Sequence, residues 1–160
     1  VNAELVAAAV LGLSLSACLW WSHFGSDDGS AERALTDAPT ERRPTLAVDA
    51  FGYWHLLILL GIIAIAFALR TITGHAFAAL PRAQAIALGG GAAIFLLGEA
   101  LFRRTLDLGA ERGRLLTALL ALVAIPVASE SSAALALVML VALFVAMLIT
   151  EGRGQSAGPA

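Results

Sequence analysis

Five long apolar runs, separated by short polar stretches, constrain this chain more than any other feature of its sequence. They cover approximately residues 4–24, 50–69, 83–102, 115–129 and 133–150. Because a helix rises 1.5 Å per residue, about 20 residues cross the ~30 Å hydrocarbon core of a bilayer. The pattern therefore predicts an all-α fold, a polytopic transmembrane helical bundle with about five spans.

The composition favours the same interpretation. Of the 160 residues, 59% are hydrophobic and 14% are charged, whereas a soluble domain has ~45–50% apolar and ~25% charged residues. The formal net charge is −2, so nothing indicates a nucleic-acid partner. The partner that the composition predicts is the lipid bilayer.

The polar stretches divide the chain into four parts. Residues 1–24 are the first transmembrane helix, and residues 25–49 are a polar linker rich in Asp, Ser and Pro. Residues 50–150 are a transmembrane region of four helices. Residues 151–160, rich in Gly, Ser and Pro, are expected to form a disordered tail.

Two of these assignments have alternatives. The fourth run is short and contains Pro126, but residues 115–150 are too long for one span and suit two spans with a turn at residues 129–132. The first run could also be a lipoprotein signal peptide cleaved before Cys18. A signal peptide begins with positive charges, and this chain begins with Asn2 and Glu4. A membrane span is therefore the preferred interpretation.

The arginines predict the orientation of the spans. All ten basic residues are arginines, and five spans would place eight of them on one side of the membrane. The positive-inside rule makes that side cytoplasmic, with the N-terminus outside and the C-terminus and the 25–49 linker inside. The eight are Arg33, Arg42, Arg43, Arg103, Arg104, Arg112, Arg114 and Arg153; the other two are Arg70 and Arg82.

Ionisable residues inside the apolar runs are the candidates for a functional site, because charges in a bilayer are costly. Glu99 interrupts the third run, and Arg103 follows it by one helical turn, so the two could form an ion pair. His55 is expected at the same depth, ~5–6 Å inside the cytoplasmic face. A polar site of Glu99, His55 and Arg103 could relay protons. The alternative is a structural Glu99–Arg103 pair.

Three glycines are candidates for close helix packing, since small residues let helices approach each other. Gly91 and Gly98 are seven residues apart on one face of the third run, and Gly61 could lie on the partner surface. A phosphate-binding loop is excluded because it needs a strand before the glycines.

Motifs of known enzyme classes are absent from the sequence. There is no HExxH and no GxSxG, and the chain has no lysine for an SxxK motif. The three histidines are in three different segments, and Cys18 is the only cysteine. We expect no enzymatic activity, no metal and no cofactor.

Several stretches together resemble the bacterial low temperature requirement protein A family, in its C-terminal half. The most specific is residues 89–104 (GGGAAIFLLGEALFRR). The others are residues 19–21 (LWW), Phe24, residues 53–56 (YWHL) and residues 61–62 (GI).

The resemblance implies a multi-pass protein of the bacterial cell (inner) membrane without a settled molecular activity. Members are about twice as long and open with a WxELFFD-type motif, which is absent here. The chain is thus expected to be a C-terminal half, or a relative that pairs with a second copy or with the missing N-terminal half. Two functions are open: movement of protons or a small solute, and a non-transporting structural or assembly subunit of a membrane complex.

Overall fold

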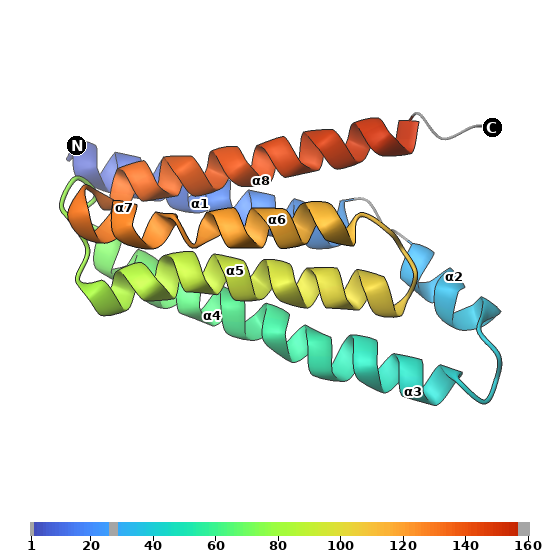
Figure 1. Cartoon of the computed structure of the whole chain (residues 1–160). Coiled ribbons are helices and arrows are strands. Elements are labelled where there is room, and N and C mark those ends of the chain that lie inside the picture. Colours follow the sequence, from blue (N-terminus) through green and yellow to red (C-terminus); the bar gives the residue numbers. More distant parts are fainter. Residues whose placement is uncertain (1, 26–28, 157–160) are drawn as a thin grey trace.

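The computed structural model of the chain describes residues 2–25 and 29–156, and every regular element in these residues is a helix (Figure 1). One element, η1, is a π-helix. The elements are α1 (Ala3–Phe24), α2 (Ser30–Asp37), α3 (Arg43–Ala47), η1 (Val48–Trp54), α4 (His55–Ile72), α5 (Arg82–Thr105), α6 (Glu111–Ala121), α7 (Ala124–Glu130) and α8 (Ala133–Ser156).

Five helices in the described part of the chain are long and apolar enough to cross a membrane. Three of them are the single helices α1, α5 and α8. The second span is one continuous helix, Arg43–Ile72, because α3, η1 and α4 follow one another without a break. The fourth span, Glu111–Glu130, consists of α6 and α7. The prediction of an all-α bundle with five spans is therefore confirmed.

The second span begins seven residues before its apolar run, at Arg43 rather than Ala50. Pro44 lies at the start of this helix, where its fixed φ and missing N–H suit the first turn. Leu106, which lies beyond the third apolar run, is buried in a small cluster with Ala50 and Phe102, so packing between helices continues beyond the apolar runs. The end of the predicted 25–49 linker thus belongs to the second span.

The helix α2 lies in the middle of the same linker, which the sequence predicted to be polar. Its apolar side chains Ala31, Ala34 and Leu35 recur at helical spacing and pack against the cluster that contains Phe102. Residues 26–28 of the linker lie outside the described part of the chain. The linker is therefore a short amphipathic helix docked against the end of α5, followed by the first turns of the second span.

The last helix, α8, continues to Ser156, six residues into the segment expected to be disordered. Glu151 is held by a side chain of α6, Arg114, and this contact anchors the helix beyond its apolar run. The first proline after Glu151 is Pro159, so nothing before it blocks the helical hydrogen bonds. Residues 157–160 of the predicted tail lie outside the described residues.

The fourth span is interrupted before Pro126. Proline has no backbone N–H, so the Leu122 carbonyl cannot accept its usual bond from residue 126. It accepts instead from the amide of Ile125, at 3.1 Å, which is the tighter bond of a 3₁₀ turn. The two pieces, α6 and α7, still form one span of the bundle (Figure 1).

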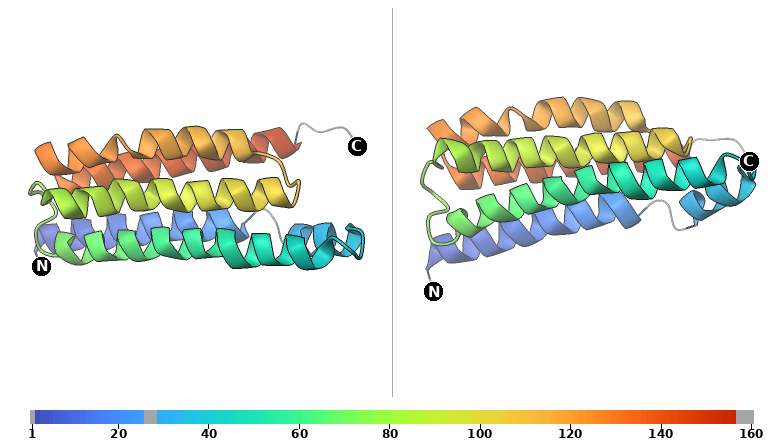
Figure 2. Two further views of the ribbon diagram at one scale, coloured as in Figure 1. Left: turned by 60° about the horizontal axis from the view of Figure 1, so that its bottom comes forward. Right: turned by 90° about the horizontal axis from the view of Figure 1, so that it is seen from below.

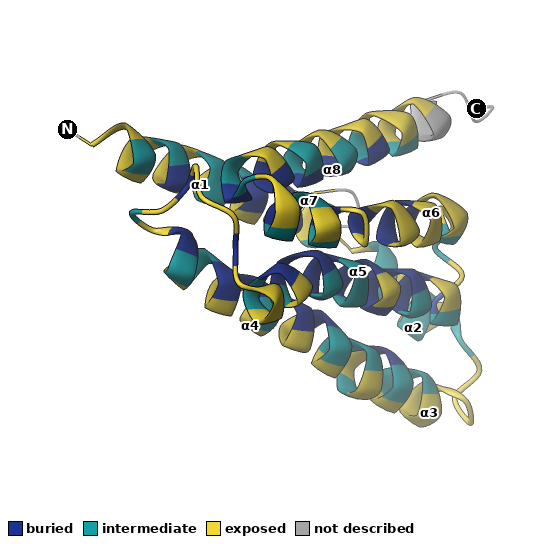
Figure 3. Cartoon of the chain, turned by 60° about the vertical axis from the view of Figure 1, so that its left-hand side comes forward, coloured by how far each residue is buried: buried dark blue, intermediate teal, exposed yellow. Residues whose placement is uncertain are grey.

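The helix α5 occupies the centre of the bundle, as Figures 1 and 2 show. It packs against α4 on one side and against α6 and α7 on the other, whereas α1 packs mainly against α8. Contacts between α1 and α4 are sparse. Figure 3 shows that buried residues line the facing sides of the helices and that exposed residues cover their outer sides. Large apolar side chains are among those exposed, for example Leu13 and Ile63, as expected for surfaces that face lipid.

The two ends of the bundle carry different segments. One end carries α2, α3 and the C-terminal part of α8, and we call it the linker end; the N-terminus lies at the opposite end (Figure 1). The chain also reverses between α4 and α5, and between α7 and α8, at that opposite end.

The structure places the three glycines singled out by the sequence at the contact between α4 and α5. A Cβ atom added to Gly61 would lie 2.7 Å from the carbonyl oxygen of Gly91, and one added to Gly98 would lie 2.9 Å from the Ile58 side chain. These separations are shorter than ordinary van der Waals contact. The backbones of α4 and α5 therefore approach more closely than any larger residue would allow.

Candidate functional site

Arg114 lies at the centre of a buried network of charged side chains near the linker end. It occupies the first turns of α6, and its side chain is fully buried. Nε and Nη2 donate to the two carboxylate oxygens of Glu151 on α8, at 3.1 and 2.9 Å. Nη1 donates to Oγ of Ser22 at 2.9 Å, and Nη2 donates to the Ser22 carbonyl at 3.1 Å. The guanidinium thus connects the end of α1, the start of α6 and the end of α8.

Glu99 on α5 is the second anion of this network. Its Oε2 accepts a hydrogen bond from Nη1 of Arg114, and its Oε1 accepts one from Nδ1 of His23 at 2.5 Å. Because an ionised carboxylate can only accept, the proton of the second bond is on the imidazole. Glu99 is 2% exposed, and a buried carboxylate without such partners would be very unfavourable.

The four side chains of the network come from four different spans. His23 belongs to α1, Glu99 to α5, Arg114 to α6 and Glu151 to α8. Two carboxylates face one permanent cation, so these groups carry a net charge of −1 when His23 is neutral and zero when it is protonated. The pair of His23 and Glu99 is therefore the place where the network can take up one proton.

His23 is the most accessible member of the network. Its side chain is 18% exposed, compared with 3% for Glu99. Its ring lies 5.6 Å from the ring of His55, between centroids, and it packs edge-on against Phe24 at 4.6 Å. Of the four side chains, the imidazole of His23 is therefore the one with the most exposed surface.

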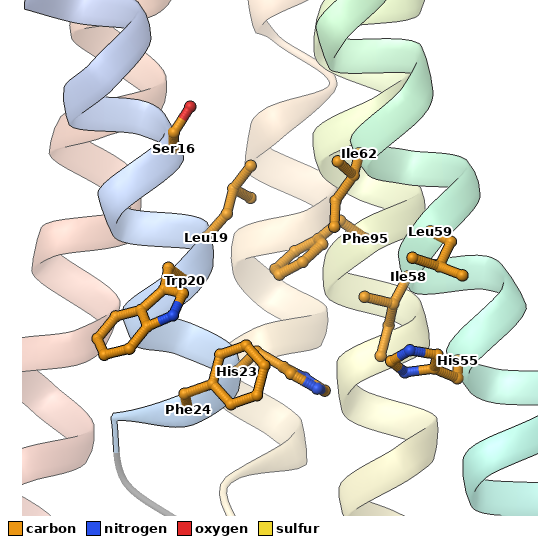
Figure 4. Close-up of a pocket in the computed structure, with 10 residues that line it drawn as sticks. All are labelled: Ser16, Leu19, Trp20, His23, Phe24, His55, Ile58, Leu59, Ile62 and Phe95. Atoms are coloured by element: carbon orange, nitrogen blue, oxygen red, sulfur yellow. The ribbon is translucent and has the colours of Figure 1, made fainter.

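A pocket of about 320 Å³ opens between α1 and α4 beside His23. Its walls are apolar except for the hydroxyl of Ser16 toward one end, the imidazoles of His23 and His55 at the other, and the indole N–H of Trp20. In Figure 4, His23 points from α1 toward His55 on α4, and Phe95 of α5 lies behind the space between them. The two histidines thus form the polar end of an otherwise apolar pocket.

The sequence placed Glu99, His55 and Arg103 in one polar site. In the structure, Glu99 and His55 lie on two sides of His23, which connects them. Arg103 is buried as well, but its Nε donates to the carbonyl of Gly109 at 2.9 Å. Arg103 therefore holds the loop between α5 and α6, and the two oxygens of Glu99 are occupied by other side chains.

Three members of the network were missing from the predicted site. His23 was not predicted to be a site residue, and Arg114 was counted only among the eight arginines of the cytoplasmic side. Glu151 was placed in the tail. The sequence signal that could have found them was depth in the membrane. His23, Glu99 and Arg114 all lie within one or two helical turns of the predicted cytoplasmic ends of their apolar runs.

Within residues 2–25 and 29–156, no three His, Cys, Asp or Glu side chains are grouped so that they could hold a metal ion. His23, Glu99, Arg114 and Glu151 are joined by hydrogen bonds and ion pairs, whereas Nδ1 of His55 is buried without a hydrogen-bond partner in the described residues. The chemistry that the site offers is the uptake and release of a proton.

Comparison with known proteins identifies the family. No curated protein and no solved structure matches the chain. The family model described as "Bacterial low temperature requirement A protein (LtrA)" matches residues 1–149, which covers all five spans except the end of α8. The five apolar helices and this match together make the chain an integral membrane protein of bacteria that belongs to the low temperature requirement A family.

Proposed function

We propose that this chain moves protons, alone or together with a small solute, and that the His23–Glu99 pair is its proton-binding site. The observation that carries the proposal is the unequal charge of the buried network. Two carboxylates share one guanidinium, and the only other member that can supply a positive charge is His23. An imidazole ordinarily changes its charge between about pH 5 and 8.

The surroundings of His23 suit the loading of a proton from the linker end. The groups that face its ring are the Glu99 carboxylate on α5, His55 on α4, and the apolar rings of Phe24 and Phe102. Beyond Glu99, toward the opposite end, the core of the bundle consists of apolar side chains such as Leu88, Phe95 and Phe144. Transfer to the other side of the membrane therefore requires a movement of the helices, which the sparse α1–α4 contact allows.

Proton flux into liposomes tests this function. The purified chain is reconstituted with a trapped pH-sensitive dye, and a potassium diffusion potential drives proton entry. We expect faster acidification than in empty liposomes, and we expect His23→Gln to slow it about tenfold or more, because a positioned proton-transfer group typically contributes ~10²–10⁴-fold to a rate.

The matched control for this flux experiment is His75→Gln. His75 is exposed and lies at the opposite end of the bundle, between α4 and α5, so its replacement should leave the flux unchanged. Equal fluxes for the wild type and both variants, or a wild-type flux no greater than that of empty liposomes, would refute proton movement through His23.

We further propose that the linker end is cytoplasmic and the N-terminus external. Arg33, Arg104 and Arg112 are exposed at the linker end, whereas Arg70 and Arg82 lie at the opposite end. A larger number of arginines on one side is the usual mark of the cytoplasmic face.

Cysteine labelling in intact bacterial cells tests this orientation. In a background with Cys18→Ala, the exposed Ala79 and Thr40 are replaced one at a time by cysteine. A membrane-impermeant maleimide should label Ala79→Cys in intact cells and Thr40→Cys only after permeabilisation. The reverse pattern would place the linker end outside.

The second candidate function is that of a structural or assembly subunit. The observation that favours it is that Arg114 joins elements of four spans through Ser22, Glu99 and Glu151. Such a network could serve only to fix the helices relative to one another. In that case His23→Gln would alter stability without changing any proton flux, so the liposome experiment separates the two functions.

A further inference from the structure

The pocket between α1 and α4 opens sideways out of the bundle. The two helices have few contacts with each other, and Trp20 and Leu59, which line the pocket from opposite helices, are 56% and 42% exposed. Both helices are membrane spans, so the opening faces the bilayer rather than water. A molecule that enters here comes from the lipid phase.

The dimensions of the pocket suit one hydrocarbon chain. From His23 to Ser16 is seven residues of α1, or roughly 10 Å along the helix, compared with ~15 Å for one leaflet of a ~30 Å hydrocarbon core. The volume of about 320 Å³ is at the lower end of the ~300–1,000 Å³ found for small-molecule sites. The pocket thus extends through most of one leaflet and has room for a single narrow chain.

The polar end of the pocket indicates the head group. His23 and His55 are the two groups there that can both donate and accept a hydrogen bond, beside the indole N–H of Trp20, which can only donate. Nδ1 of His55 is buried with no hydrogen-bond partner in the described residues. Buried polar atoms in native proteins nearly always have a partner. A carboxyl group can accept from one imidazole and share its proton with the other.

The charge of the neighbouring network favours a carboxylic acid over a phosphate. Behind His23 lie Glu99, Arg114 and Glu151, whose charges sum to −1. A phosphodiester head group is anionic at every physiological pH and would be repelled by the carboxylate of Glu99, the charged group in direct contact with His23. A carboxylic acid can enter in its neutral form, because its ionisation is much less complete in an apolar environment.

We propose that this pocket binds one long-chain fatty acid, with its carboxyl group at His23 and His55 and its hydrocarbon chain between α1 and α4. This is a binding site in addition to the proton-binding pair. Its occupancy can be measured without any proton movement, so it stands or falls separately from the proposed function.

Binding of tritiated palmitic acid to the purified full chain in detergent tests the proposal. We expect saturable binding that Leu59→Trp weakens about tenfold or more, because the indole fills the pocket. Leu60→Trp is the matched control: Leu60 is equally apolar, is 51% exposed and lies outside the pocket, so this variant should bind like the wild type. Ile62→Trp, which also fills the pocket, replaces Leu59→Trp if that variant does not fold.

Competition identifies the occupant. Unlabelled palmitic acid should displace the label at least about tenfold better than methyl palmitate or dioleoylphosphatidylglycerol. His55→Phe should remove this preference for the acid over its ester, because the loss of a hydrogen bond to a charged group has an effect of this size. Non-saturable binding, equal binding by the pocket-filling variants and Leu60→Trp, or equal displacement by the ester or the phospholipid would overturn the proposal.

Discussion

Replacement of Arg114 by methionine is expected to lower the free energy of unfolding by about 3–5 kcal/mol, the usual effect of removing one partner from a buried ion pair. Methionine keeps most of the side-chain volume but leaves the carboxylates of Glu99 and Glu151 without their guanidinium. Thermal unfolding of the detergent-purified protein, followed by circular dichroism, measures the loss of stability.

A nearby arginine provides the control for this experiment. Arg112 lies two positions earlier in α6 and is exposed. Arg112→Met should therefore change the free energy of unfolding by no more than an ordinary surface substitution does, about ±0.5 kcal/mol. Similar unfolding temperatures for Arg114→Met and Arg112→Met would contradict the buried network.

A triple variant shows whether the loss comes from charge. Combining Arg114→Met with Glu99→Gln and Glu151→Gln removes all three fixed charges, and such complete replacements of buried ionic groups are often neutral or even stabilising. The triple variant should therefore recover much of the stability that Arg114→Met loses. It should still lack proton flux, because the carboxylate that pairs with His23 is gone.

The five spans could be predicted from the sequence because length and hydropathy alone decide whether a helix can cross a bilayer. Their ends could not, because ends depend on tertiary contacts. The second span extends before its apolar run, and the part of this extension that packs against the end of α5 is η1, through Ala50. The last helix continues beyond its apolar run because Glu151 is held by Arg114.

The candidate site could be predicted only in part. Glu99 was identifiable because a carboxylate inside an apolar run is costly and needs a partner. The sequence suggested the nearest arginine on the same helix, Arg103, since spacing within one helix is visible in a sequence. The actual cation, Arg114, belongs to another helix, and the rotation of one helix against another is set by side-chain packing over the whole bundle.

The π-helical segment η1 is a further feature of the second span that the sequence did not predict. It directly precedes His55, and a π-turn has a wider hydrogen-bonded repeat than an α-turn, so residues on its two sides are rotated relative to a regular helix. Trp54 at its end donates from Nε1 to the hydroxyl of Thr105 at 2.9 Å, a contact across helices that stabilises this local geometry. A regular helix, as the sequence predicts, would direct Trp54 and the residues before it differently relative to α4, whereas His55 is in regular register with the rest of α4.

Replacement of Gly91 by leucine is the second change with a large expected effect. A Cβ atom at Gly91 would lie 3.0 Å from the Cβ of Ala64 and 3.0 Å from the carbonyl oxygen of Gly61, and the rest of the leucine side chain has no free space between α4 and α5. Overpacking of a core ordinarily lowers the stability by about 1–3 kcal/mol. At Gly91 the added side chain would meet backbone atoms, which cannot move aside by a change of rotamer as a side chain can, so we expect a larger loss of stability. Thermal unfolding in detergent and the yield of monodisperse protein measure the effect.

The adjacent glycine makes this prediction specific to the helix contact. Gly90 is half-buried and lines an apolar pocket between α5 and α6, where the nearest atom to an added Cβ is in Ile86, at 3.9 Å. Leucine is the better helix former by nearly 1 kcal/mol, so Gly90→Leu should leave the stability unchanged or raise it slightly. Two identical substitutions at neighbouring positions thus have opposite expected signs. Equal losses at both positions would mean that glycine is needed for the helix α5 itself and not for its approach to α4. A loss of stability at Gly91 alone would mean that the close approach of Gly61 to Gly91 is needed. The same contact holds α4, and with it His55, beside the buried network.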